Sequence, residues 1–180
     1  MSADLNLLDS ARKMDGDALI KIFDLYSRAI YNYALRLCSD PLMADYIVGD
    51  VFSKLLEQLS AGHGPNANLR AYLYEMAYHL IVDDARSAHR EIAFEMIDTF
   101  RHDNYSAAVS FEKRMAIEHI MLAMRKHLTR DQRHVLILRF IEGFSLRETA
   151  AIIGKEVSNV KVIQNRAVAA LRKALDYVVT

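Results

Sequence analysis

Two helix-capping patterns near the C-terminal end constrain the fold of this chain more than any other feature. In each, a hydroxyl residue is followed three positions later by a side chain that reaches back to the cap: Thr129 with Gln132, and Ser145 with Glu148. Gly143 and Gly154 follow, and glycine readily adopts the left-handed conformation that ends a helix. The pattern predicts two short helices, each closed by a tight turn.

A third helix follows the turn, with Ser158 placed to cap it. Its apolar residues recur at three- and four-residue spacing and share one face: Val160, Ile163, Ala167 and Leu171. At about 100 degrees per residue, the opposite face and its flanks carry the candidate DNA-binding residues. These are Ser158, Asn159, Lys161, Val162, Asn165, Arg166 and Arg172. The pattern is a helix-turn-helix, whose last helix fits the major groove, although an ordinary helical hairpin with a solvated polar face has the same periodicity.

The charges divide the chain into two halves. The formal net charge is zero, but residues 1–112 hold 10 Lys and Arg against 17 Asp and Glu, whereas residues 113–180 hold 13 against 6. A basic C-terminal half fits contact with phosphates, and an acidic N-terminal half favours a protein partner. The single cysteine, Cys38, excludes an internal disulfide. No export signal or membrane-spanning apolar stretch is visible, so we expect a cytoplasmic protein without membrane insertion.

The N-terminal half predicts a four-helix domain. Residues 1–14 are expected to be a frayed or partly helical lead-in, and apolar spacing then predicts two helices in close succession over residues 17–37. Asp40 and Pro41 announce a third helix, and a fourth begins at Leu69 after a break. The fold class expected is all-α, with helical domains at residues 1–90 and 112–180 joined by a linker at 91–111.

These motifs resemble the extracytoplasmic-function (ECF) sigma factors of bacterial RNA polymerase. Residues 128–136, 143–150, 160–161 and 166–167 are similar to sigma region four, which binds the minus-thirty-five promoter element, and residues 17–91 resemble region two. The resemblance implies a chain that directs core RNA polymerase to promoter DNA and assists promoter opening. It also implies an anti-sigma factor as a partner.

Within region two, the resemblance assigns polymerase binding to the helix after Pro41, with Asp45 and Asp50 as the contacts. Tyr46 and Gly49 stand where the family pattern usually has an acidic residue and a glutamine. Both substitutions change polar positions of the family's polymerase-binding helix.

The next helix matches the family's promoter-melting segment. Its predicted DNA-binding residues are Arg70, Tyr72, His79, Asp83, Arg86 and Arg90. Tyr72 replaces a common tryptophan and His79 a common asparagine. Tyr74 and Tyr78 are further candidates for stacking on unpaired bases, or else they are partly buried. The small, polar loop at residues 60–68 is suited to receive a flipped base.

No catalytic motif is present, so we expect no enzyme activity, no catalytic residue and no cofactor. His79 and Asp83 lie four residues apart on one helix, but a zinc site needs three or four ligands, so no metal is predicted. Two alternatives to a sigma factor stay open. One is a helix-turn-helix regulator that acts without polymerase, and the other is a sigma mimic that sequesters an anti-sigma factor.

Overall fold

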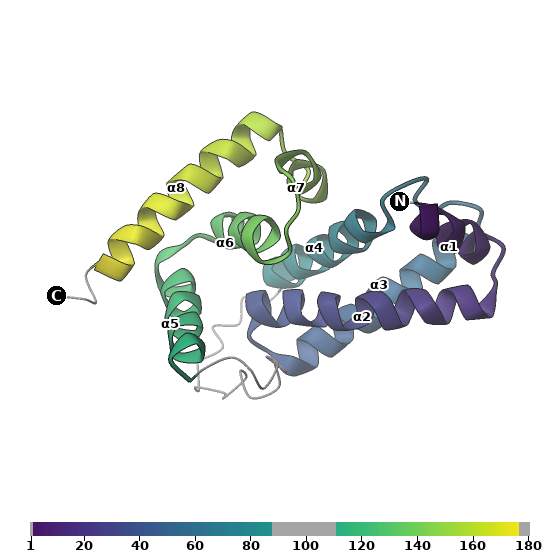
Figure 1. Ribbon diagram of the computed structural model, residues 1–180, viewed down its shortest axis with the longest axis horizontal. Coiled ribbons are helices and arrows are strands. Elements are labelled where there is room, and N and C mark those ends of the chain that lie inside the picture. Colours follow the sequence, from purple (N-terminus) through teal and green to yellow (C-terminus); the bar gives the residue numbers. More distant parts are fainter. Residues whose placement is uncertain (1, 88–110, 177–180) are drawn as a thin grey trace. The chain divides into compact units, whose positions relative to one another are not determined.

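The structure, a computed structural model, describes residues 2–87 and 111–176, with side chains described over 6–83 and 115–176. Every regular element in these two ranges is a helix, and the chain divides into two compact units, residues 1–93 and 94–180 (Figure 1). The predicted all-α class with two helical units is confirmed. The predicted linker lies outside the described residues except for its last residue.

The first unit consists of α1 (Ser2–Arg12), α2 (Gly16–Cys38), α3 (Pro41–Ser60) and α4 (Leu69–Ser87). Helices α2, α3 and α4 pack on one another, and α1 lies against α2 and α3. The largest fully buried side chains of this unit are Ile22, Ile30, Tyr33, Ile47, Leu55, Leu73 and Tyr74. The rings of Tyr33 and Tyr74, 5.1 Å apart between centroids, join α2 to α4.

The structure corrects the predicted division of the first unit. The two helices expected over residues 17–37 are one continuous helix, α2, because no glycine or proline interrupts them and Ile22, Ile30 and Tyr33 continue one buried face. The expected lead-in is helical over Ser2–Arg12 and packs through Leu8 and Ala11, which are buried. The first unit still has four helices: α2 replaces two of the predicted ones, and α1 supplies the fourth.

The sequence placed the starts of α3 and α4 correctly, the first from a cap signal and the second from the break before it. The Asp40 carboxylate accepts hydrogen bonds from the backbone N–H groups of Leu42 (2.9 Å) and Met43 (3.3 Å), as the cap prediction requires. Helix α4 begins at Leu69, where the sequence predicted it. The two helices are thus separated by a loop of defined length at residues 61–68.

The second unit consists of α5 (Phe111–His127), α6 (Arg130–Leu136), the π-helix η2 (Ile137–Ile141), α7 (Leu146–Ile152) and α8 (Val157–Asp176). Helix α8 packs against α5, α6 and α7. The large side chains at the centre of this unit are Ile137, Leu138, Phe144 and Ile152. Both predicted capping boxes are formed, and Gly143 and Gly154 have φ angles of 74° and 63°, the left-handed conformation expected of them.

Two details of the second unit differ from the sequence prediction. The helix expected to run from Thr129 to Gly143 changes into a π-helix after Leu136, which adds a residue to the turn and leaves both Ile137 and Leu138 buried. Helix α8 begins at Val157, so Ser158 lies inside its first turn and does not cap it.

Candidate nucleic-acid interface

The predicted DNA-binding residues of α8 form one exposed surface. Val160, Ala167 and Ala174 are buried against the rest of the unit, and the side chains on the opposite side of α8 are exposed. The exposed set is Ser158, Asn159, Lys161, Val162, Asn165, Arg166 and Arg172. The predicted division of the helix into two faces is confirmed, and the polar face is accessible to a ligand.

Arg139 holds the turn and α8 together. It lies on η2, where its Nε donates a hydrogen bond to the Gln164 side-chain oxygen of α8 (3.0 Å) and its Nη1 donates to the Phe144 carbonyl in the turn before α7. Hydrogen bonds from a charged donor are stronger than neutral ones. Sequence reasoning gave Arg139 no such role, because its partners lie on two other elements.

A second charged contact involves the connection between α7 and α8. The Lys155 Nζ lies 3.3 Å from the Asp131 carboxylate, joining the segment before α8 to the first turn of α6. Both side chains are partly exposed, so the pair adds little stability by itself.

His134 is the buried polar residue of α6. Burial lowers the pKa of its imidazole from 6.5 to about 3, with Asp131 opposing this shift and the cations Arg130 and Arg133 adding to it. The ring is therefore neutral near pH 7. His134 adds no charge to the basic unit under those conditions.

Helix α4 gathers only some of its predicted DNA-binding residues. Tyr72, His79 and Asp83 follow at intervals of seven and four residues and so share the outer face, with His79 and Asp83 exposed. Arg70 lies on the opposite side of the helix, with its guanidinium carbon 5.4 Å from the centroid of the Tyr74 ring. The side chain of Arg86 and the whole of Arg90 lie outside what the structure describes.

The three tyrosines of α4 have different environments. Tyr74 and Tyr78 are buried, so the hypothesis that they stack on unpaired bases is wrong; their positions on the helix face the core. Tyr72 is only partly buried. Burial first, and then the nearby Glu75 carboxylate, raises the pKa of the Tyr72 phenol above its ordinary value of 10.0, so its hydroxyl stays protonated near neutral pH.

The outer face of α3 is more apolar than the sequence suggested. Asp45 is exposed as expected, but Asp50 is mostly covered and its carboxylate lies 2.8 Å from the Lys54 ammonium. Along the same face stand large apolar side chains with high exposed fractions: Leu42 81%, Tyr46 61% and Leu56 41%. We call Leu42, Asp45, Tyr46, Gly49, Ser53 and Leu56 the α3 outer face. Their spacing off the core stripe was the signal that sequence reasoning missed.

The loop between α3 and α4 presents polar side chains. His63, Asn66 and Asn68 are exposed, whereas Pro65 is buried. This agrees with the predicted polar surface at residues 60–68. These side chains are therefore accessible to any ligand that the loop receives.

The described residues hold no group of three or more His, Cys, Asp and Glu side chains arranged for a metal ion. Within the same ranges, no helix has both the length and the apolar character needed to cross a membrane.

Two family models match the chain. The model for Sigma-70 region 2 matches residues 22–91, and the model for Sigma-70, region 4 matches residues 126–173. Together these segments cover more than half of the 180 residues. The first match covers most of α2 and all of α3 and α4, and the second covers α6, η2, α7 and most of α8.

Several characterised proteins are similar in sequence. The ECF RNA polymerase sigma factor BldN of Streptomyces coelicolor is 25% identical over 174 residues, covering 95% of this chain and 65% of BldN. SigX of Bacillus subtilis is 26% identical over 161 residues, covering 86% of this chain and 82% of SigX. SigD of Mycobacterium tuberculosis is 32% identical over 135 residues, covering 73% and 62%. The chain thus spans less than two thirds of the length of BldN and of SigD.

Two solved structures share the fold. CnrH, in complex with the cytosolic domain of CnrY, has a TM-score of 0.72 at 23% identity, covering 97% of this chain and 98% of that one. The sigma factor RpoE in complex with the anti-sigma factor NepR, from Bartonella quintana, has a TM-score of 0.68 at 23% identity, covering 87% and 95%.

Proposed function

We propose that this chain, which belongs to the sigma-70 family and within it to the extracytoplasmic-function (ECF) group, directs core RNA polymerase to specific promoters and helps to open them. The observation that carries the proposal is the presence of regions two and four, in that order, on one chain. Each region keeps an accessible face where the family meets its partners. The protein acts in the cytoplasm with the polymerase and performs no catalytic step of its own.

The exposed face of α8 is the proposed minus-thirty-five reader. Lys161 and Arg166 contact phosphates, which fixes the register of the helix but carries no sequence information. Asn159 and Asn165 reach base edges, since an amide can both donate to and accept from a base pair in the major groove. Ser158, Val162 and Arg172 complete this surface, whose side chains are all exposed.

The outer face of α4 and the loop at residues 61–68 form the proposed minus-ten site. The partly exposed Tyr72 ring offers a surface for an unpaired base to stack on, and such stacking accepts any base. His79 and Asp83 continue this face, and Arg86 follows His79 by seven residues on the same helix. Arg70 lies on the opposite side of α4, against the buried Tyr74 ring, so we do not include it in this site.

The α3 outer face is the proposed polymerase contact. Family resemblance assigns this helix to a coiled coil of the largest polymerase subunit, and the exposed Leu42, Tyr46 and Leu56 supply apolar anchors for it. Asp45, next to Tyr46 on this face, is exposed and supplies a charged contact. Asp50 contributes in part, because Lys54 already neutralises its carboxylate.

Charge reversal on α3 tests this assignment. We expect the double variant Asp45→Lys, Asp50→Lys to lose binding to core RNA polymerase in a pull-down while keeping its helical circular dichroism spectrum. The matched control reverses two exposed carboxylates on α2, Asp17→Lys and Asp24→Lys, and should bind core normally. Unchanged binding by the α3 variant, or equal loss in the control, would overturn the assignment.

Two binding assays separate the alternatives. A regulator that acts without polymerase would fail to bind core in the pull-down even as the wild-type chain, and a sigma mimic would fail to bind promoter DNA in a separate DNA-binding assay. CnrH and RpoE were each solved in a complex, RpoE with an anti-sigma factor, and we extend the expectation of an anti-sigma partner to this chain.

A further inference from the structure

The loop between α3 and α4 is fixed at both ends. Gly64 packs so closely on the end of α3 that a Cβ there would lie 2.9 Å from a methyl carbon of Leu59, so a larger residue would force the Leu59 side chain to move. At the other end, the Asn68 side-chain oxygen accepts a hydrogen bond from the Ala71 N–H (3.1 Å) in the first turn of α4. The residues between these two ends, Pro65 and Asn66, are contacted by a third helix.

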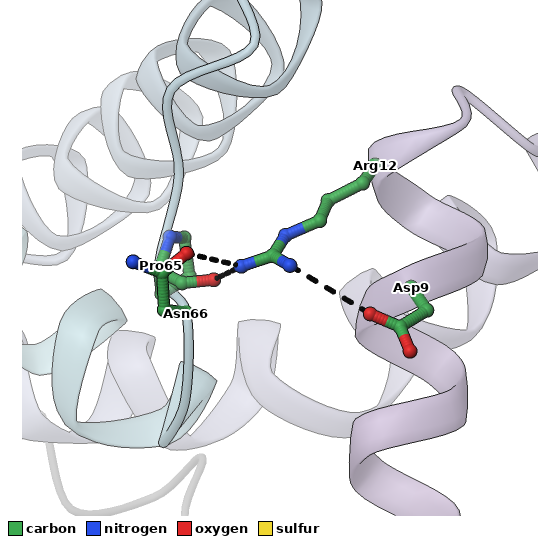
Figure 2. A network of polar contacts seen from close by, with 4 residues as sticks. All are labelled: Asp9, Arg12, Pro65 and Asn66. Atoms are coloured by element: carbon green, nitrogen blue, oxygen red, sulfur yellow. Dashed lines mark hydrogen bonds and ion pairs between the residues drawn. The ribbon is translucent and has the colours of Figure 1, made fainter.

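The middle of the loop is held by α1, as Figure 2 shows. The Arg12 Nη2 donates hydrogen bonds to the Pro65 carbonyl and to the Asn66 side-chain oxygen, the second at 2.8 Å. Its Nη1 lies 3.7 Å from the Asp9 carboxylate, one turn back on the same helix. The guanidinium is thus directed at the loop from one side and supported by Asp9 from the other.

The backbone of α1 is itself anchored. Ala11, adjacent to Arg12, is fully buried, and Leu8 is 2% exposed. Because these residues pack into the unit, the Cα of Arg12 is fixed relative to the core. The contact with Pro65 therefore transmits the position of α1 to the loop.

The contact also decides which end of the Asn66 amide faces outward. A guanidinium has donors and no acceptor, so Asn66 must present its oxygen to Arg12. Its NH₂ group is then the end left for a ligand, and Asn66 is exposed. An NH₂ group donates hydrogen bonds, and the matching partner on a base is a carbonyl oxygen or a ring nitrogen.

We propose that Arg12 is a positioning residue that holds the α3–α4 loop and the Asn66 amide in the orientation that receives one unpaired promoter base through its acceptor atoms. This inference rests on the proposed sigma function, because it takes the loop to lie beside the opened minus-ten strand. Arg12 does not touch the base. It acts through Pro65 and Asn66.

The test uses the full chain with core polymerase and fork-junction DNA from a promoter identified by transcription in vitro. Each unpaired minus-ten base is replaced in turn by an abasic site, and affinity is measured by fluorescence anisotropy. For the wild type we expect a loss of about tenfold at the position read by the loop, the size of one good base contact. Arg12→Ala should bind intact DNA about as weakly as the wild type binds that abasic DNA. The abasic site should not weaken the binding of Arg12→Ala any further.

Four variants separate positioning from a general loss of structure. Lys13→Ala removes the same charge at the next residue and should keep the wild-type pattern. Arg12→Lys retains a cationic donor and should recover part of the abasic penalty. Asn66→Ala and Asn66→Asp both remove the NH₂ group, and each should lose the penalty, although aspartate still accepts from Arg12. The Asn66 variants carry the test if Arg12→Ala does not fold.

The outcomes distinguish the two proposals. An unchanged abasic penalty in Arg12→Ala, or in either Asn66 variant, overturns the positioning role and leaves the sigma function intact. A wild-type holoenzyme without an abasic penalty at any position overturns the inference, whereas a chain that yields no promoter in the preceding transcription assay overturns the sigma function. A penalty lost at one position in Arg12→Ala and kept at the others supports the inference.

Discussion

Replacing Lys161 with alanine tests how α8 meets DNA. Lys161 is exposed on the second turn of α8, and its proposed partner is a phosphate. Each phosphate contact releases condensed counterions, so the logarithm of the binding constant falls with the logarithm of salt by about 0.9 per contact on duplex DNA. Raising the salt from about 50 to about 200 mM therefore weakens binding by about 3.5-fold for each such contact.

The assay is a salt titration of holoenzyme binding to promoter duplexes with intact and mutated minus-thirty-five elements. Lys161→Ala should bind both duplexes more weakly by the same factor, and its salt slope should be shallower by about one unit. Lys173→Ala is the matched control, because Lys173 is also an exposed lysine of α8 but lies about 18 Å further along the axis. Its slope should equal that of the wild type. An altered base preference at full slope in Lys161→Ala would show that the proposed orientation of α8 is wrong.

Three further predictions concern stability. Gly49→Ala should raise the free energy of unfolding of the first unit by about 1 kcal/mol in urea denaturation, because Gly49 lies inside α3 and a Cβ there meets no atom within 4 Å; unchanged stability would contradict this. Arg139→Ala should destabilise the second unit by about 2 kcal/mol, because the Phe144 carbonyl and the Gln164 side chain lose their charged donor; amide hydrogen exchange in α7 and α8 measures it. The pKa of His134 is about 3 in the folded state and 6.5 in the unfolded state. Between about pH 3 and pH 6.5, the unfolded state therefore binds a proton at His134 that the folded state does not. Stability of the second unit should therefore fall as pH drops below 6.5, by about 2 kcal/mol at a pH of about 5, and His134→Gln should flatten this dependence in hydrogen exchange.

Cap positions were predictable from the sequence because their geometry depends on residues within one helical turn. The carboxylate of Asp40 and the boxes begun by Thr129 and Ser145 need only the next two or three backbone N–H groups. The exposed face of α8 was predictable for a similar reason, because helical periodicity alone separates Lys161 from the buried Val160. The sequence therefore located the helix-turn-helix and its accessible surface.

Features that depend on distant contacts were not predictable in this way. Arg12 meets Pro65 across 53 positions of sequence, and no local pattern links them. Periodicity puts Tyr72 and Tyr74 on opposite faces of α4, but only the packing of α2 shows which of the two rings is buried. The π-helix η2 likewise follows from packing in the second unit, where Ile137 and Leu138 are both covered.

Run-off transcription tests the sigma function most directly. Purified core RNA polymerase is incubated with fragmented genomic DNA of the source bacterium, with and without the chain, and transcript start sites are mapped. Transcripts should begin at a limited set of sites that share minus-thirty-five and minus-ten elements, only when the chain is present, and disappear with Asp45→Lys, Asp50→Lys. Sequence-specific DNA binding by the chain without core, together with no chain-dependent transcripts, would contradict the account.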